Sequence, residues 1–331
     1  MNDIDFVVTW VDGNDPNWQK EKNRYLDMNV EKHGGRDNRF RDWGLLKYWF
    51  RGVEENANWV NKIHFITWGH IPEWLNVNHT KLNIITHDDY IPKEFLPTFN
   101  SNVIEIFLHR IEELAEKFVL FNDDMYIINR VMPEDFFEGD IPKDEALLEA
   151  VICQNPDDKF GHILLNNSSV INKYYNKKTV QKERRRQFYS LLYKQALIRN
   201  ILLTPMEYFS GFRDLHLPSS HTKAIFEEVW SCEREVLLKT AGHRFRSIED
   251  INHWLFKNWR CCKGDFVPRN VNWGRYFEIG RDKDIPMIID KKNCKVVCVN
   301  DGVNDNCFDN EKKKLIEAFE KIYPQKSTYE I

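Results

Sequence analysis

Five short apolar runs with high β-propensity divide the sequence, and each ends in Asp, Asn or His. Apolar runs of this length, bounded by turn residues, are typical of buried strands. Amphipathic stretches between them, such as residues 101–117, predict helices. This alternation predicts an α/β fold with a mostly parallel sheet and flanking crossover helices. The five runs cover residues 4–9, 62–67, 82–86, 118–121 and 295–299.

Polar side chains gather where these runs end, most clearly in the triplet Asn122-Asp123-Asp124 after the fourth run. The carboxyl ends of parallel strands share one edge of a sheet, where ligands bind in open α/β folds. Paired carboxylates are the oxygen donors that suit a divalent cation holding phosphates. The alternative is that strand ends simply need polar turn residues. Recurrence at all five ends favours a binding site.

Composition excludes several classes of protein. At 331 residues and 39.8 kDa the chain can bury a sizeable core. The net charge of −4 argues against a nucleic-acid binder, and no apolar stretch approaches the ~20 residues of a membrane span. The start, Met1–Asp5, lacks the basic and apolar regions of a signal peptide. Seven cysteines without a CxxC pair favour a reducing compartment. We therefore expect a cytoplasmic protein without a transmembrane segment.

The pattern predicts one domain spanning residues 1–331. Residues 1–130 and 211–310 form its α/β core, residues 131–210 a mainly helical insertion, and residues 311–331 a C-terminal helix and tail. The late strand is expected to return to the main sheet. Further helices are predicted at residues 177–200, 219–239, 248–260 and 310–322.

Four segments resemble, in order, the signature regions of the Stealth family of capsular polysaccharide phosphotransferases. The family also includes the catalytic subunit of the lysosomal-enzyme N-acetylglucosamine-1-phosphotransferase. The resemblance covers nearly the whole chain and implies a GT-A-like or Rossmann-like fold. The matching segments are residues 5–16; residues 39–124, including Arg39–Asp42 and Asn122–Asp124; residues 216–250, including His216–Pro218 and Arg244–Ser247; and Val299–Asp301.

The resemblance implies a reaction and its partners. A hydroxyl of a growing cell-surface glycan attacks the β-phosphorus of a UDP-sugar, so that hexose- or N-acetylhexosamine-1-phosphate is transferred and UMP is released. The acceptor is expected to be lipid-linked. Loose association with the inner face of the plasma membrane then follows, with the basic run Lys177–Arg186 as the expected contact.

The resemblance also assigns metal ligands. Asp124 and Asp301 are the first choice, with Asp123 and Asn300 beside them. Such a cation would bridge the diphosphate. Mg²⁺ or Mn²⁺ fits ligation by oxygen alone, whereas zinc prefers His and Cys.

Three residues of this sequence are assigned catalytic roles in the same way. His216 is the expected base for the acceptor hydroxyl, with His221 as its rival. Arg246 is expected to meet the charge on the phosphoryl oxygens. Asp12 either orients the acceptor or contacts the nucleotide.

Substrate-binding roles are expected for further residues. Arg39 and Arg41 would bind phosphate. Asn100 and Asn102 precede or begin a helix and either bind sugar or phosphate or merely cap that helix. Trp10 and Trp68 stand at strand ends, where their rings could form a ligand wall.

Two other functions fit part of the sequence. A metal-dependent GT-A-type glycosyltransferase would transfer the sugar alone and release UDP. A non-catalytic glycan- or nucleotide-binding protein would not depend on His216 or Arg246. Release of UDP instead of UMP would identify the first alternative. Activity that is retained after substitution of His216 or Arg246 would identify the second.

Overall fold

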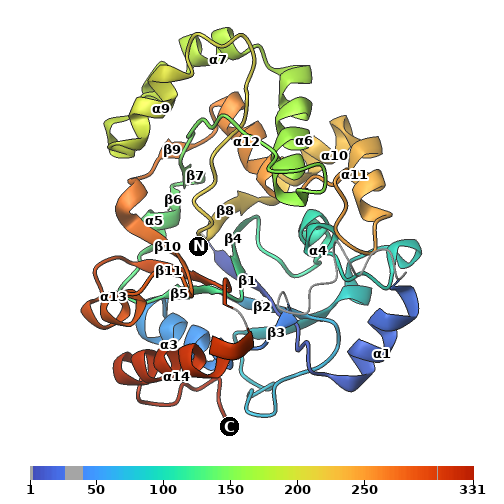
Figure 1. Cartoon of the computed structure of the whole chain (residues 1–331), viewed down its shortest axis with the longest axis vertical. Coiled ribbons are helices and arrows are strands. Elements are labelled where there is room, and N and C mark those ends of the chain that lie inside the picture. Colours follow the sequence, from blue (N-terminus) through green and yellow to red (C-terminus); the bar gives the residue numbers. More distant parts are fainter. Residues whose placement is uncertain (1–2, 27–39, 304) are drawn as a thin grey trace.

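A five-stranded sheet runs through the middle of the computed structural model, which describes residues 3–26, 40–303 and 305–331 (Figure 1). Its strand order is β3-β2-β1-β4-β8. The first four strands are parallel, and β8 is antiparallel to β4. The four strands predicted near the N-terminus therefore lie side by side, and their carboxyl ends share one edge. The strands are β1 (Ile4–Thr9), β2 (Ile63–Thr67), β3 (Leu82–Thr86), β4 (Lys117–Asn122) and β8 (Ser219–Thr222).

Both faces of this sheet are buried, because neighbouring residues of each strand enter two different cores. Phe6 and Val8 of β1 pack into one core, and Val7 between them packs into the other. This explains why the strands are continuously apolar. The first core includes α3 (Leu46–Asn56), α13 (Ile285–Lys291) and α14 (Asp305–Ile322). The second includes α4 (Ser101–Ile106), α10 (Lys223–Cys232), α11 (Arg234–Ala241) and α12 (Trp254–Lys263) (Figure 1).

The late strand, expected to return to the main sheet, lies in a second sheet of order β10-β11-β5. Because β8 occupies the edge of β4, β11 pairs instead with β5, which leaves β4 after the turn Asp123–Asp124. The pairing places Cys298 opposite Met125, directly beside this turn. These strands are β5 (Met125–Ile127), β10 (Gly274–Glu278) and β11 (Val296–Asn300).

The helix predicted over residues 101–117 is much shorter in the structure. Helix α4 ends at Ile106, and a 3₁₀ turn follows at Leu108–Arg110. Ile111 and Leu114 reach the same core from irregular backbone. Their spacing in the sequence matches that of a helix face, although the backbone there is not helical. The chain has to turn here to begin β4 beside β1, and the Asp5 carboxylate accepts the N–H of Ala115 (2.8 Å) in that turn.

The helix predicted over residues 219–239 begins later than expected. Its first four residues form β8, because Ser, His and Thr are weak helix formers and the edge of β4 offers hydrogen bonds. The Thr222 side chain accepts the N–H of Ile225 and caps α10. Glu233 then separates α10 from α11. The helix predicted from residue 248 likewise begins only at Trp254.

Residues 131–210 contain mostly helices and form the upper part of the molecule in Figure 1. Strands β6 and β7 of this segment pair with each other, and β7 also pairs with β9, in a small third sheet. No helix within the described ranges has both the length and the apolar character that crossing a membrane requires. The remaining elements are α1 (Pro16–Tyr25), α5 (Pro133–Phe136), β6 (Phe137–Glu138), β7 (Ile141–Asp144), α6 (Lys159–Tyr174), α7 (Lys177–Glu183), α8 (Arg185–Phe188), α9 (Ala196–Leu202) and β9 (Val267–Pro268).

Candidate active site

A cavity of about 940 Å³ opens where β1, β4 and β11 end. Asp12 and Asn100 do not line it, and Arg39 lies outside the described residues. The structure thus brings most of the predicted site residues around one space. Those that line the cavity are Trp10, Arg41, Asn102, Asp123, Asp124, His216, Arg246, Asn300 and Asp301.

The turn between β4 and β5 presents the acidic pair to this cavity. The backbone carbonyl of Asp124 accepts the N–H of Val299 (2.8 Å), which fixes the turn to β11. The Cys298 thiol donates to Asp124 Oδ2 (3.3 Å). Asp124 Oδ1 and Asn122 Oδ1 are buried without a hydrogen-bond partner in the described part of the chain. Unpaired buried acceptors are costly, and these two oxygens, on residues that line the cavity, are open to a contact from a ligand.

The charges of the acidic pair differ. Loss of bulk water and the nearby carboxylates of Asp124 and Asp42 raise the pKa of Asp123 to about 7, although its side chain opens into the cavity. Burial also favours a higher pKa for Asp124, but hydrogen bonding and attraction from His216 outweigh it, so the pKa of Asp124 is lowered. The Asp124 carboxylate is therefore ionised near neutrality, whereas Asp123 exchanges between its protonated and ionised forms.

These donors fit a hard divalent cation. The unpaired Oδ1 of Asp124 and the crowded Asp123 carboxylate offer oxygens whose mutual repulsion a cation would relieve. Asp124, His216 and Cys298 also form a possible three-ligand cluster. However, burial and Asp124 raise the pKa of Cys298 well above its usual range. The sulfur is thus a thiol that donates to Asp124, which favours Mg²⁺ or Mn²⁺ over a thiolate-bound ion.

His216 sits in a strained loop that two other residues hold in place. Its φ of 50° lies in the left-handed region, which is uncommon outside glycine. The Asp214 carboxylate accepts the His216 N–H (2.7 Å) through Oδ1 and the Lys257 Nζ (2.8 Å) through Oδ2. The imidazole then lies edge-on to Trp254, and its Nε2 is 3.5 Å from Asp124 Oδ2. This left-handed backbone conformation directs the imidazole ring toward the acidic pair.

The two histidines considered as the base lie in different environments. Burial lowers the pKa of His216, but the Asp124 carboxylate more than compensates, and the net pKa is raised. His221 is fully buried in β8, where it packs on Phe118 and Phe226. Burial lowers its pKa well below the usual range. Because His221 does not line the cavity, only His216 of the two can meet a ligand there.

Arg246 enters the cavity from a loop anchored on a buried carboxylate. Asp250 accepts hydrogen bonds from Asn100 Nδ2 (2.9 Å), Asn102 Nδ2 (3.0 Å) and the Ser247 N–H (3.0 Å). The guanidinium donates to the Ser101 hydroxyl (2.6 Å) at the start of α4. Within the described ranges no carboxylate forms an ion pair with Arg246. Its charge is therefore available to an anionic ligand.

Several predicted residues have structural contacts instead. Asn100 is buried and caps α4 by accepting the N–H of Asn102 (3.1 Å), which is one of the two roles left open. The Asp12 carboxylate accepts the N–H of Asn14 (2.8 Å) outside the cavity. Trp68 donates its indole N–H to Glu21 and does not line the cavity.

At another part of the cavity wall, Asp301 and Arg41 neutralise each other. Asp301 Oδ2 lies 3.1 Å from Arg41 Nε, and Oδ1 accepts from Arg41 Nη2 (3.3 Å). The Trp43 indole and the Val303 N–H also donate to this carboxylate (3.3 and 3.0 Å). A predicted metal ligand and a predicted phosphate-binding residue are thus paired, so Asp124 is the better ligand.

A buried pair that sequence reasoning missed also lines the cavity. His253 Nδ1 lies 2.6 Å from Glu105 Oε2, and both side chains are nearly inaccessible. Glu105 follows Asn102 by three residues on α4 and so lies on the same face of the helix. The sequence could therefore have predicted that Glu105 lies near the site. His253 lies just before α12, and no pattern in the neighbouring sequence predicts that it lies at the site.

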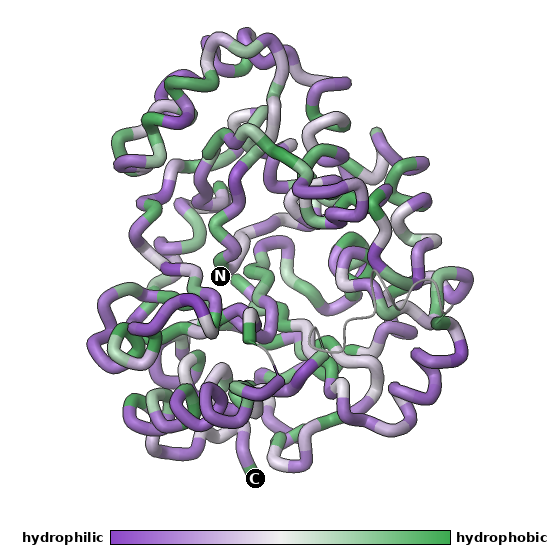
Figure 2. The backbone as a smooth tube through the Cα atoms, in the orientation of Figure 1, coloured by the Kyte–Doolittle hydropathy of each residue, from purple (hydrophilic) through white to green (hydrophobic). Residues whose placement is uncertain are grey.

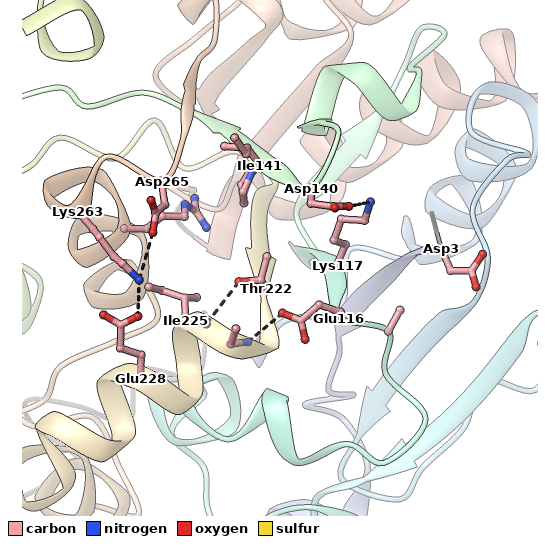
Figure 3. A pocket seen from close by; sticks show the side chains of 14 residues that line it. Asp3, Glu116, Lys117, Asp140, Ile141, Thr222, Ile225, Glu228, Lys263 and Asp265 are labelled. Atoms are coloured by element: carbon pink, nitrogen blue, oxygen red, sulfur yellow. Dashed lines mark hydrogen bonds and ion pairs between the residues drawn. The ribbon is translucent and has the colours of Figure 1, made fainter. Parts of the chain in front are cut away.

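A second hollow, of about 730 Å³, lies near the amino end of β4 (Figure 3). Several of its charged side chains form ion pairs with one another. Lys117 meets Asp140 (3.0 Å), and Lys263 meets Glu228 and Asp265 (2.7 and 3.2 Å). None of the predicted site residues lines it, so it does not compete as the active site.

Comparison with known proteins agrees with the first two of the four predicted signature regions. The family models described as Stealth protein conserved regions 1 and 2 match residues 2–30 and 39–144. A capsular polysaccharide phosphotransferase WcwK from Streptococcus pneumoniae is 44% identical, with 100% of this chain and 98% of the relative covered. Exopolysaccharide phosphotransferase cps2G from Lactiplantibacillus plantarum is 38% identical over 99% and 96%. Receptor polysaccharide phosphotransferase WefC from Streptococcus oralis is 36% identical over the full length of both.

Among solved structures, galactosyltransferase LgtC, in complex with donor and acceptor sugar analogs, covers 95% of both chains at a TM-score of 0.39 and 11% identity. The sequence relatives, in contrast, match from end to end at high identity. By that match the chain belongs to the Stealth family of capsular and exopolysaccharide phosphotransferases.

Proposed function

We propose that this protein transfers hexose-1-phosphate or N-acetylhexosamine-1-phosphate from a UDP-sugar to a hydroxyl of a growing cell-surface polysaccharide. The acceptor oxygen attacks the β-phosphorus and forms a new P–O bond, and the bond to the UMP phosphate breaks. A phosphodiester and UMP result. The acceptor is lipid-linked, and the reaction takes place at the inner face of the plasma membrane.

His216 takes the proton of the acceptor hydroxyl, and Arg246 binds the non-bridging phosphoryl oxygens. Asp124 and Asp123, with Asn300 beside them, would hold Mg²⁺ or Mn²⁺, and such an ion would supply positive charge against the diphosphate. Trp10 and Trp254 form apolar walls that exclude water from the reacting groups. Asp12 has no assigned role in this scheme.

One observation supports the proposal above others. A histidine whose Nε2 lies 3.5 Å from an under-coordinated carboxylate shares a cavity with an arginine that has no acidic partner in the described ranges. The set contains a base, a cation site and an anion site, which are the groups that attack at phosphorus requires.

The test is to incubate the protein with a panel of UDP-sugars, Mg²⁺ or Mn²⁺, and acceptor glycan. We expect UMP release that depends on the acceptor and a new phosphodiester signal in the ³¹P spectrum. His216→Gln and Arg246→Ala should lose this activity, whereas His79→Gln, a histidine outside the cavity, should retain it. Release of UDP without a phosphodiester would contradict the proposal and support the glycosyltransferase alternative.

A further inference from the structure

Helix α9 lies at the upper left of the molecule in Figure 1, and its backbone is partly coloured as hydrophobic in Figure 2. One face of this helix is apolar and exposed. Ile198, Ile201 and Leu202 share this face by their i, i+3, i+4 spacing and are 59%, 54% and 72% exposed. Asn200, on the opposite side, is fully buried. Its side chain donates to the carbonyls of Ala146 and Phe188 (2.8 and 2.7 Å). The helix is thus anchored by a polar residue and presents its apolar stripe to the outside, the reverse of an ordinary surface helix.

The apolar surface extends beyond the helix and is held in a defined conformation. Leu191, in the 3₁₀ turn before α9, is 81% exposed, and Tyr208 after it is 62% exposed. The Tyr189 and Thr204 hydroxyls are hydrogen-bonded (2.7 Å) across the helix ends. Lys177 Nζ donates to the carbonyl of Met206 (2.9 Å). Scattered apolar side chains are normal on a surface, but residues 191–208 expose seven large ones in a segment that these hydrogen bonds hold in place, which indicates an interface.

The same segment carries a strong positive charge. Residues 177–208 contain eight lysines and arginines and two glutamates, in a chain whose net charge is −4. Lys177 and Arg199 are engaged by Leu203 and Glu149. Five other cations are exposed and form no ion pair within the described ranges, which leaves their charge available to a partner. They are Lys178, Lys182, Arg185, Arg186 and Lys194.

We propose that these apolar and basic side chains, hereafter the α9 surface, dock the protein on an anionic lipid bilayer. The apolar side chains enter the headgroup region, and the basic ones contact anionic headgroups, as in interfacial amphipathic helices. A second copy of the chain is disfavoured as the occupant, because two such surfaces would bring like charges together. The inference rests on the proposed function in that a lipid-linked acceptor requires the enzyme to work at a membrane.

The test is sedimentation of the purified full chain with vesicles of phosphatidylcholine, with and without phosphatidylglycerol. We expect binding only to the anionic vesicles and weaker binding at high salt. Arg185→Ala/Arg186→Ala/Lys194→Ala should weaken it about 100-fold, since each basic residue contributes about fivefold near such a surface. Ile198→Ser/Leu202→Ser should weaken it more than tenfold.

Matched controls lie on the opposite side of the molecule. Lys313→Ala/Lys314→Ala/Lys321→Ala removes three exposed charges of α14, and Met287→Ser removes an exposed apolar residue of α13. Both should bind vesicles like the unaltered chain.

Vesicle binding that is equally strong with and without phosphatidylglycerol would overturn the proposal. So would binding that neither of the two α9-surface variants weakens. So would a dimer in light scattering that Ile198→Ser/Leu202→Ser dissociates, because the surface is then an interface between copies. Vesicle binding and UMP release fail separately: a chain that binds vesicles without releasing UMP refutes the proposed function and leaves the α9 surface supported.

Discussion

The cavity contains two acidic regions that resemble each other in sequence and differ in structure. Asp124 keeps a buried oxygen without a partner, and the adjacent Asp123 is crowded by like charge. Asp301, in contrast, is surrounded by Arg41, Trp43 and the Val303 N–H. The first region has a titratable imidazole, His216, beside one of its oxygens, whereas the second already contains a permanently charged guanidinium. The difference supports the proposal that the first region holds a cation and that the second shapes the wall.

The largest expected effect separates these two regions directly. Asp124→Asn keeps the size of the side chain but removes its charge, so UMP release should fall about 1,000-fold, because the metal contributes several kcal/mol to the transition state. Asp301→Asn should lower activity about tenfold or less, since it acts through Arg41. Equal losses would contradict the distinction, and circular dichroism checks that both variants fold.

A second comparison concerns the two arginines. Arg246→Ala should lower turnover about 100-fold with little effect on stability, because Arg246 contacts only the Ser101 hydroxyl among the described hydrogen bonds. Arg41→Ala should instead lower the melting temperature, because it leaves the partly buried Asp301 carboxylate without its cationic partner. The double variant Arg41→Ala/Asp301→Asn should recover stability. A stable Arg41→Ala with no activity would mean that Arg41 binds substrate.

A third test uses the pH dependence of metal affinity. A carboxyl group must lose its proton to ligate a cation, and the pKa of Asp123 is about 7. Affinity for Mn²⁺, measured by electron paramagnetic resonance, should therefore fall by up to about tenfold per pH unit below 7. Asp123→Asn should bind more weakly and lose this dependence, whereas Asp301→Asn should retain it. A dependence unchanged in Asp123→Asn would mean that Asp123 is not a ligand.

Much of the sheet followed from the sequence, because short apolar runs ending in polar residues have few alternatives. The strand after residue 295 was recognised, but its sheet was not, since pairing partners depend on which edges other strands leave open. The same limit applies to the site. The strand-end pattern predicted Asp124 and the family resemblance predicted His216, and both line the cavity. The pairing of Asp301 with Arg41 and of Glu105 with His253, in contrast, depends on distant segments meeting. Local residue types do not encode such contacts.

The smallest expected effect contrasts His221 with His216. His221 is buried with both ring nitrogens unpartnered, and its pKa is lowered well below its usual range. The unfolded chain therefore binds a proton below about pH 6.5 that the folded chain does not. The free energy of unfolding should fall with decreasing pH, by up to about 1.4 kcal/mol per unit for each such histidine. His216, whose pKa is raised, acts in the opposite direction.

His221→Phe keeps the ring between Phe118 and Phe226 and removes the titrating group. In urea denaturation at pH 7, 6 and 5, this variant should show a shallower loss of stability than the unaltered chain. Burial also lowers the pKa of His87 and His109 to about 4, so part of the slope should remain. UMP release should persist, because the ring does not line the cavity. If His221→Phe abolished turnover in a folded protein, the assignment of the base to His216 would be wrong.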